Sequence, residues 1–336
     1  MNFQIGIVHI GIIILAIFGP NFQGTELQAS AATDSPAGET AVVSIYPVAL
    51  SAPGRGEDLQ LRVSAPISGS KLPAIIFAHG NGMSANDYAP LVNYWAAHGF
   101  VVVQPTFLDA KILGLGPDDP RSPAIWRFRV KDMKRVIDDF AIVEASIPGL
   151  KGRVDRSRIA AVGHSYGGLT TAMLLGAQII GTDGKKEDLS DRRIKAGVLL
   201  STAGNGGKNL SAFAAKNFPF MNPSYTEMAK PTLVIAGDRD ISRLTVRGPD
   251  WFTDAYVHSS NDKCLATLFG GEHMLGGISG AGVTATTDEN AARVTAVQRL
   301  SLAFLQSALY PGNEAWPKAH AAMNSAQNAI GRVECK

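Results

Sequence analysis

Residues 159–167 read Ile159-Ala160-Ala161-Val162-Gly163-His164-Ser165-Tyr166-Gly167, an apolar run followed by the pattern Gly-x-Ser-x-Gly. After this pattern, apolar and small residues recur at helical spacing as far as Ile180. The order predicts a buried strand, a sharp turn and a helix, and such a turn presents a serine hydroxyl at the end of the strand. Glycine on both sides of the serine lets strand and helix approach closely. We therefore interpret Ser165 as a nucleophile.

Apolar segments alternate with helical patterns on both sides of this turn. Continuous runs rich in β-branched residues are typical of parallel strands that are covered on both faces. We expect an α/β fold with a mostly parallel central sheet of about eight strands, helices on both faces and an N-terminal antiparallel hairpin. The predicted hairpin strands are 42–50 and 59–63, and the predicted parallel strands are 74–78, 101–104, 159–162, 196–200, 233–236 and 265–269.

The N-terminus has the features of an export signal. Residues 5–18 are almost entirely apolar and are followed by Ala29-Ser30-Ala31, which has the form of a cleavage site. No Lys or Arg precedes the apolar stretch, so an uncleaved membrane anchor is the alternative. A helix of that length reaches only about 21 Å, whereas the hydrocarbon core is about 30 Å thick. We expect a periplasmic or secreted protein with no stable membrane span after cleavage.

These boundaries divide the chain into four parts. We expect a signal peptide at 1–31, a disordered leader at 32–40, one domain at 41–312 and a C-terminal tail at 313–336.

Composition limits the classes of partner. Of the 336 residues, 46% are hydrophobic and 18% are charged, and the formal net charge is +2. Because the sequence contains no basic patch, we exclude nucleic acid and favour small molecules. Cys264 and Cys335 lack the spacing of metal ligands. They either pair as a disulfide in an oxidising compartment or remain thiols.

A serine nucleophile needs an imidazole to accept its proton and a carboxylate to orient that imidazole. His273 follows the last predicted parallel strand in a glycine-rich loop and is our candidate base, with His258 as the alternative. The preceding strand ends next to two carboxylates, Asp238 and Asp240. We favour Asp240 because it lies farther along the turn, from where it can point back at the imidazole.

An attacked carbonyl develops a negative oxygen in the transition state and needs preorganised N–H donors. We expect one donor at the backbone of Tyr166, directly after the serine. The second is expected at Asn81, in the loop after strand 74–78, with Gly82 as the alternative. His79 is expected to brace this loop as a buried residue.

Several other side chains near these positions are open to two readings. Trp126 and Trp251 are candidates for the substrate pocket, with an ordinary core position as the alternative. His164, beside the nucleophile, is expected to pack rather than react. The charged residues of one helical pattern are expected to form a solvated or interhelical ion pair: Arg127, Arg129 and Asp132.

Seven segments together resemble a known group of proteins. They are Ala78-His79-Gly80-Asn81-Gly82, Ala97-His98-Gly99-Phe100-Val101-Val102, Val154-Asp155, Arg158-Ile159-Ala160, Gly163-His164-Ser165-Tyr166-Gly167-Gly168, Ala236-Gly237-Asp238-Arg239-Asp240 and Gly271-Glu272-His273. The chain resembles α/β-hydrolase superfamily serine hydrolases of the chlorophyllase and dienelactone-hydrolase-like group. It is more distantly similar to platelet-activating-factor acetylhydrolases and bacterial cutinases.

The resemblance implies the α/β-hydrolase fold and a carboxylic-ester hydrolase. Ser165, Asp240 and His273 would form its triad, without a metal or an organic cofactor. Dienelactone hydrolases have a cysteine where this chain has serine, so dienelactone is not the expected substrate. No insertion long enough for a lipase lid is evident between Leu200 and Pro231.

These features predict an exported serine esterase that acts through an acyl-enzyme on a small-molecule or polymeric ester. An acyltransferase or a peptidase with the same triad is one alternative. A catalytically silent binding module on the same fold is another.

Overall fold

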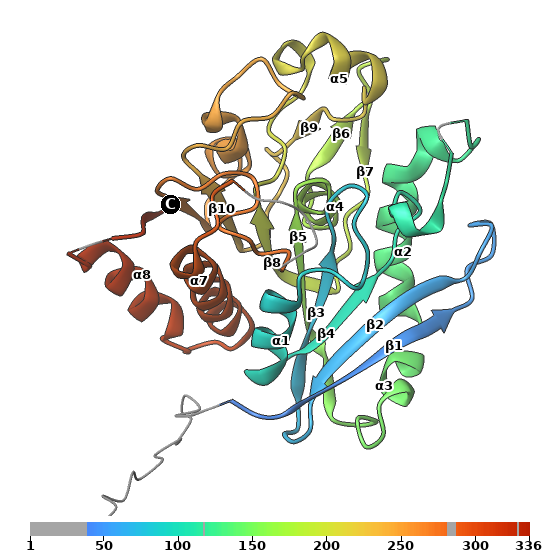
Figure 1. Ribbon diagram of the computed structural model, residues 1–336, viewed down its shortest axis with the longest axis vertical. Helices are drawn as coiled ribbons and strands as arrows, with labels where there is room; N and C mark the ends of the chain where they lie inside the picture. Colours follow the sequence, from blue (N-terminus) through green and yellow to red (C-terminus); the bar gives the residue numbers. More distant parts are fainter. Residues whose placement is uncertain (1–38, 117, 281–286, 328) are drawn as a thin grey trace, which may run out of the picture. The chain divides into compact units, whose positions relative to one another are not determined.

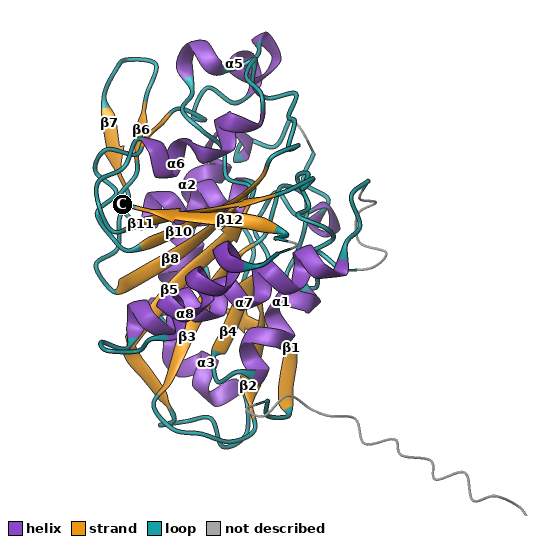
Figure 2. Ribbon diagram, turned by 90° about the vertical axis from the view of Figure 1, so that its left-hand side faces the viewer, coloured by secondary structure: helices purple, strands orange, loops and turns teal. Residues whose placement is uncertain are grey.

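The computed structural model describes residues 39–336 except 117, 281–286 and 328. Nine of its strands form one sheet in the order β1-β2-β4-β3-β5-β8-β10-β11-β12 (Figure 2). The six strands from β4 to β11 are parallel, while β2 and β12 join them by antiparallel pairing and β1 pairs antiparallel with β2. The bounds are β1 (Val42–Leu50), β2 (Leu59–Pro66), β3 (Leu72–Ala78), β4 (Val101–Pro105), β5 (Val154–His164), β8 (Ile194–Leu200), β10 (Thr232–Gly237), β11 (Lys263–Leu268) and β12 (Gly331–Cys335).

Helices cover both faces of this sheet (Figure 1). Alternation along the strands explains why both faces need cover, because Ile75 and Phe77 belong to one apolar cluster and Ile76 to the other. The first face is covered by α1 (Ala89–Ala97), α7 (Ala291–Leu309) and α8 (Ala315–Ser325), and the second by α2 (Ile125–Asp138), α3 (Phe140–Ser146) and α4 (Tyr166–Leu174). The predicted fold class and N-terminal hairpin are confirmed.

Shorter helices connect these elements. They are η1 (Lys111–Leu113), η2 (Ser122–Ala124), η4 (Pro249–Thr253) and α6 (Asp254–Val257). None of the helices in the described part of the chain is long and apolar enough to cross a membrane.

The C-terminal residues do not form a separate tail. Residues 313–336 contain α8 and β12, and β12 is the edge strand of the main sheet next to β11. Cys335 of β12 is in register with Cys264 of β11, and the two form a disulfide across a Cα–Cα distance of 4.1 Å. Residues beyond the predicted boundary at 312 thus add an edge strand to the main sheet. A five-residue edge strand shows too little periodicity to be recognised in sequence, since its partner supplies the order.

A small cap follows from the connections on either side of β8. It consists of β6 (Gln178–Ile180), β7 (Lys186–Asp188), η3 (Gly207–Asn209), α5 (Ala212–Asn217) and β9 (Pro223–Ser224). The three strands form a separate sheet in the order β7-β6-β9, near the top of Figure 1. The connection between Leu200 and Pro231, in which no lid was expected, thus contributes structured elements to this cap.

The predicted signal peptide at 1–31 and most of the predicted leader lie outside the described residues. At the start of the described chain, the Thr40 backbone N–H donates to the Ala97 carbonyl over 2.9 Å.

Candidate active site

The predicted serine turn connects β5 to α4. Ser165 lies between them with φ 57° and ψ −118°, a backbone conformation that residues other than glycine rarely adopt. Two glycines make the turn possible. A Cβ atom at Gly163 would overlap the backbone of Gly167, and one at Gly167 would overlap the carbonyl of Ala78 in β3. This sharp turn places the serine hydroxyl at the carboxyl end of the sheet.

The hydroxyl of Ser165 meets an imidazole and, behind it, a carboxylate. His273 Nε2 lies 2.8 Å from Ser165 Oγ. His273 Nδ1 lies 3.0 and 3.1 Å from the two carboxylate oxygens of Asp240. Asp240 follows β10 and has no exposed side-chain surface, whereas the His273 side chain, after β11, is 37% exposed. The three residues that were selected from sequence are thus brought together from loops after three parallel strands.

The alternatives considered for base and acid have other partners. His258 follows α6 and its Nε2 lies 3.7 Å from Asp254 Oδ1. Asp238 accepts a hydrogen bond of 2.7 Å from the backbone N–H of Gly270 and so holds the loop before His273. Neither side chain is part of the Ser165 relay.

A buried hydrogen-bond chain anchors the backbone of His273. His164 Nε2 donates to the His273 carbonyl over 2.8 Å, and His164 Nδ1 accepts from the Tyr88 hydroxyl over 2.8 Å. Burial, with the nearby His273, lowers the pKa of His164 to about 3. The ring is therefore neutral and able to accept and donate at once. His164, which was expected only to pack, therefore also positions His273.

Asn81 and Tyr166 both line the cavity that contains Ser165. Within the described residues, neither of their backbone N–H groups donates to another protein atom. The alternative donor, the N–H of Gly82, is directed to Asp109 Oδ2 at 3.3 Å. The N–H of Gly82 is therefore used within the protein, whereas that of Asn81 has no protein acceptor among the described residues.

His79 braces the loop that carries Asn81, as expected. Its Nε2 accepts from the Phe107 N–H over 3.0 Å, which leaves the proton on Nδ1 to be donated to the Gly80 carbonyl over 2.7 Å. Burial, with the nearby positive charge of Arg129, lowers the pKa of His79 to about 3. This histidine is therefore a neutral structural residue.

Of the three charged residues singled out on α2, Arg129 and Asp132 are buried, whereas Arg127 is at the surface. Arg129 pairs with Asp109 behind the Asn81 loop, and Asp132 pairs with Arg55 of the turn between β1 and β2. Both pairs are buried, whereas Arg127 pairs with Glu187 at the surface. The expectation of a solvated or interhelical ion pair is wrong for Arg129 and Asp132, because their partners lie on segments that are distant along the chain.

Two cavities meet at Tyr166 and Asn81. One, of about 200 Å³, contains Ser165 and His273 and has apolar walls that include Trp251, Phe252 and Met221. The other, of about 820 Å³, extends along the cap past Trp126. Both predicted tryptophans therefore line these spaces.

Two cap residues at the junction of the cavities were not identified from the sequence. Phe218 and Phe220 line both spaces, and the Phe220 ring stacks on Trp126 with centroids 5.7 Å apart. They follow α5 in an irregular segment, so no periodicity distinguished them from other aromatic residues. In the described part of the chain, no three His, Cys, Asp or Glu side chains gather as a metal site would require.

Comparison with known proteins places this geometry in context. The family model described as "Alpha/beta hydrolase family" matches residues 75–324. The chain is 30% identical to the chlorophyllase type 0 of Chenopodium album over 130 residues, which are 37% of this chain and 34% of that protein. It is 25% identical to the platelet-activating factor acetylhydrolase of Cavia porcellus over 204 residues, 49% of this chain and 43% of that protein. The matched regions thus span less than half of the length of these relatives.

Proposed function

The chain belongs to the alpha/beta hydrolase family, and on this premise we propose that it hydrolyses carboxylic esters through an acyl-enzyme on Ser165. The observation that carries the proposal is the continuous contact from Ser165 Oγ through His273 to Asp240. A serine hydroxyl is a weak nucleophile until a base in hydrogen-bond contact accepts its proton. The relatives named chlorophyllase and platelet-activating factor acetylhydrolase support an ester as the substrate class.

The proposed reaction has two halves. In the first, Ser165 Oγ attacks the ester carbonyl while His273 Nε2 takes the hydroxyl proton, and the backbone N–H groups of Asn81 and Tyr166 stabilise the resulting oxyanion. The carbonyl–oxygen bond to the alcohol then breaks, and His273 returns the proton to the leaving alkoxide. In the second half, water attacks the acyl-enzyme with His273 as base, which releases the acid and restores Ser165. Asp240 orients the imidazole throughout.

The unequal cavities indicate how an ester divides between them. An apolar cavity of about 150 Å³ in a protein can hold a benzene molecule, so the space of about 200 Å³ beside Ser165 fits a short acyl chain or a single ring. The cleft of about 820 Å³ is within the usual size of ligand sites. We propose that the small group enters the first space and the larger part of the ester lies along Trp126 and Phe220.

Covalent labelling tests the nucleophile directly. A fluorophosphonate probe is expected to label the wild-type protein and not Ser165→Ala. Ser242→Ala is the matched control, because Ser242 lines the same cavity and must leave labelling intact. Absence of labelling in folded wild-type protein would instead favour the binding module. Product analysis with competing alcohols and amines separates hydrolysis from acyl transfer and from peptide cleavage.

The N-terminal signal and the cysteine pair support export as part of this proposal. Residues 1–31 have the pattern of a cleavable signal, and a disulfide between Cys264 and Cys335 is favoured in an oxidising compartment. Mass spectrometry of the mature protein is expected to find Ala32 at the N-terminus. An intact Met1 in exported protein would support the membrane anchor.

A further inference from the structure

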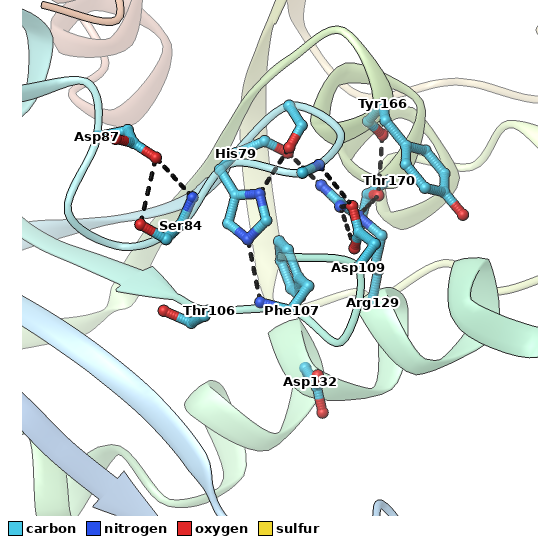
Figure 3. A network of polar contacts seen from close by, with 12 residues as sticks. His79, Ser84, Asp87, Thr106, Phe107, Asp109, Arg129, Asp132, Tyr166 and Thr170 are labelled. Atoms are coloured by element: carbon cyan, nitrogen blue, oxygen red, sulfur yellow. Dashed lines mark hydrogen bonds and ion pairs between the residues drawn. The ribbon is translucent and has the colours of Figure 1, made fainter. Parts of the chain in front are cut away.

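Arg129 lies behind the two peptide segments that carry the proposed oxyanion donors. Its guanidinium is completely buried between two aromatic rings, 4.2 Å from the centroid of Phe107 and 4.3 Å from that of Tyr166. One terminal nitrogen donates to both carboxylate oxygens of Asp109 over 2.6 and 2.7 Å. Figure 3 shows Arg129 and Asp109 side by side at the centre of this network.

The pair holds the Asn81 loop at two points. The other terminal nitrogen of Arg129 donates to the His79 carbonyl, just before the donor peptide. Asp109 accepts from the Gly82 N–H just after it, over 3.3 Å. The Asn81 peptide is therefore bracketed by hydrogen bonds to one buried ion pair.

The same guanidinium also reaches the first turn of α4. Arg129 Nε donates to Thr170 Oγ1 over 3.2 Å, and Thr170 Oγ1 donates to the Tyr166 carbonyl over 3.0 Å (Figure 3). Because the Tyr166 ring also packs on the guanidinium, both the backbone and the side chain of this residue are tied to it. One buried cation thus connects the two sides of the oxyanion site.

We propose that Arg129 and Asp109 form a positioning pair that sets the spacing of the Asn81 and Tyr166 N–H groups. The inference rests on the proposed function, since these donors matter only if an oxyanion forms. Donors aimed at a developing charge act only when their geometry is preorganised. A guanidinium is suited to this task because its planar fork directs several hydrogen bonds at fixed angles, which an ammonium group does not. Neither residue reacts, because both act through the peptides they hold.

A matched pair of variants separates positioning from stability. Asp109→Asn removes the charge that holds Arg129, and Asp132→Asn removes the equivalent charge from the second buried pair on α2. With a short-chain nitrophenyl ester, Asp109→Asn is expected to lower kcat by about 10- to 100-fold and to change KM less than about 2-fold. Asp132→Asn is expected to keep kcat within about 2-fold of the wild type, whatever its effect on the melting temperature.

Arg129→Lys is the second variant, in case Asp109→Asn does not fold. It keeps the positive charge next to Asp109 but cannot reach His79 and Thr170 together, so the same selective loss of kcat is expected. A boronic acid inhibitor, which becomes tetrahedral when a serine oxygen adds to boron, provides an independent readout, because its affinity must fall in parallel with kcat. Equal kcat in the wild type and in whichever of these variants folds would overturn the proposal. Absence of fluorophosphonate labelling in the wild type would instead overturn the proposed function.

Discussion

Helix α2 carries two buried ion pairs one turn apart, and they hold different parts of the molecule. Arg129 and Asp109 have 0% and 8% of their side-chain surface exposed, and Arg55 and Asp132 have 2% and 1%. The first pair binds peptides on both sides of the proposed oxyanion site. In the second pair, Arg55 donates to carbonyls of its own turn and, over 2.8 Å, to that of Thr106, so it fixes the hairpin. The two ion pairs are therefore similarly buried but hold different segments of the chain.

The two carboxylates also differ in their electrostatic balance. Burial by itself would raise the pKa of Asp109, but Arg129, with help from the Gly82 N–H, holds the pKa below its ordinary value. At Asp132 burial prevails over the attraction of Arg55 and raises the pKa to about 6. Asp109 accepts two short hydrogen bonds from Arg129, whereas Asp132 accepts one from Arg55. At similar burial, the hydrogen bonds to each carboxylate therefore decide whether its pKa falls or rises.

The strongest test of this contrast removes each cation. Arg129→Met and Arg55→Met each leave a buried carboxylate without its ion partner, and each is expected to lower the free energy of unfolding by about 3–5 kcal/mol. Urea denaturation measures this loss. The rate of fluorophosphonate labelling, corrected for the folded fraction, is expected to fall only in Arg129→Met. Equal labelling rates would show that the two pairs differ in location alone.

The two carboxylates are expected to make the free energy of unfolding depend on pH in opposite directions. Because the pKa of Asp132 rises from 3.8 to about 6, the folded protein binds more protons than the unfolded chain between these values. The contribution of Asp132 to the free energy of unfolding therefore falls as pH rises through this window, by up to about 3 kcal/mol. Asp109 has the opposite sign: its contribution is present above its ordinary pKa and is lost as pH falls below it.

Urea denaturation across this pH range tests the opposite signs. Asp132→Asn is expected to remove the decline between about pH 4 and pH 6, whereas Asp109→Asn is expected to lose most stability, relative to the wild type, at neutral pH. Parallel pH profiles for the two variants would contradict the assignment.

The smallest expected effect comes from two neighbouring threonines of α4. Thr170 links Arg129 to the Tyr166 carbonyl, whereas the buried hydroxyl of Thr171 has no hydrogen-bond partner among the described residues. Thr170→Val is expected to lower the free energy of unfolding by about 1 kcal/mol and kcat a few-fold. Thr171→Val, the control, is expected to keep both. Loss of kcat in both variants would point to general loosening of α4.

Much of the candidate site was predictable because its signals are local. The Ser165 turn needs a strand, two close-packed glycines and a helix in immediate succession, and all of these are visible within a short segment. His273 was selected by its place after the last predicted parallel strand. Two carboxylates, Asp238 and Asp240, follow the same strand in sequence. The structure separates them because Asp240 contacts His273 Nδ1, whereas Asp238 accepts from the Gly270 N–H.

Other features gave no local signal. Strand β12 is five residues long, and its order comes from pairing with β11 and from the disulfide. The cap residues Phe218 and Phe220 lie in irregular chain, so their role at the junction of two cavities depends on where that chain passes. In sequence, Arg129 resembles any other basic residue of an amphipathic helix. Its buried partner, Asp109, comes from the loop after β4.

The sequence by itself determined the N-terminal hairpin, the succession of the six parallel strands and the strained serine turn, since these follow from periodicity and from the conformations that single residues allow. Only the tertiary structure decided which carboxylate meets His273, which ion pair lies behind the Asn81 peptide and how the cap divides the space beside Ser165. These choices depend on distances between segments that are far apart along the chain, and no local pattern records such distances because they arise from the packing of the whole domain.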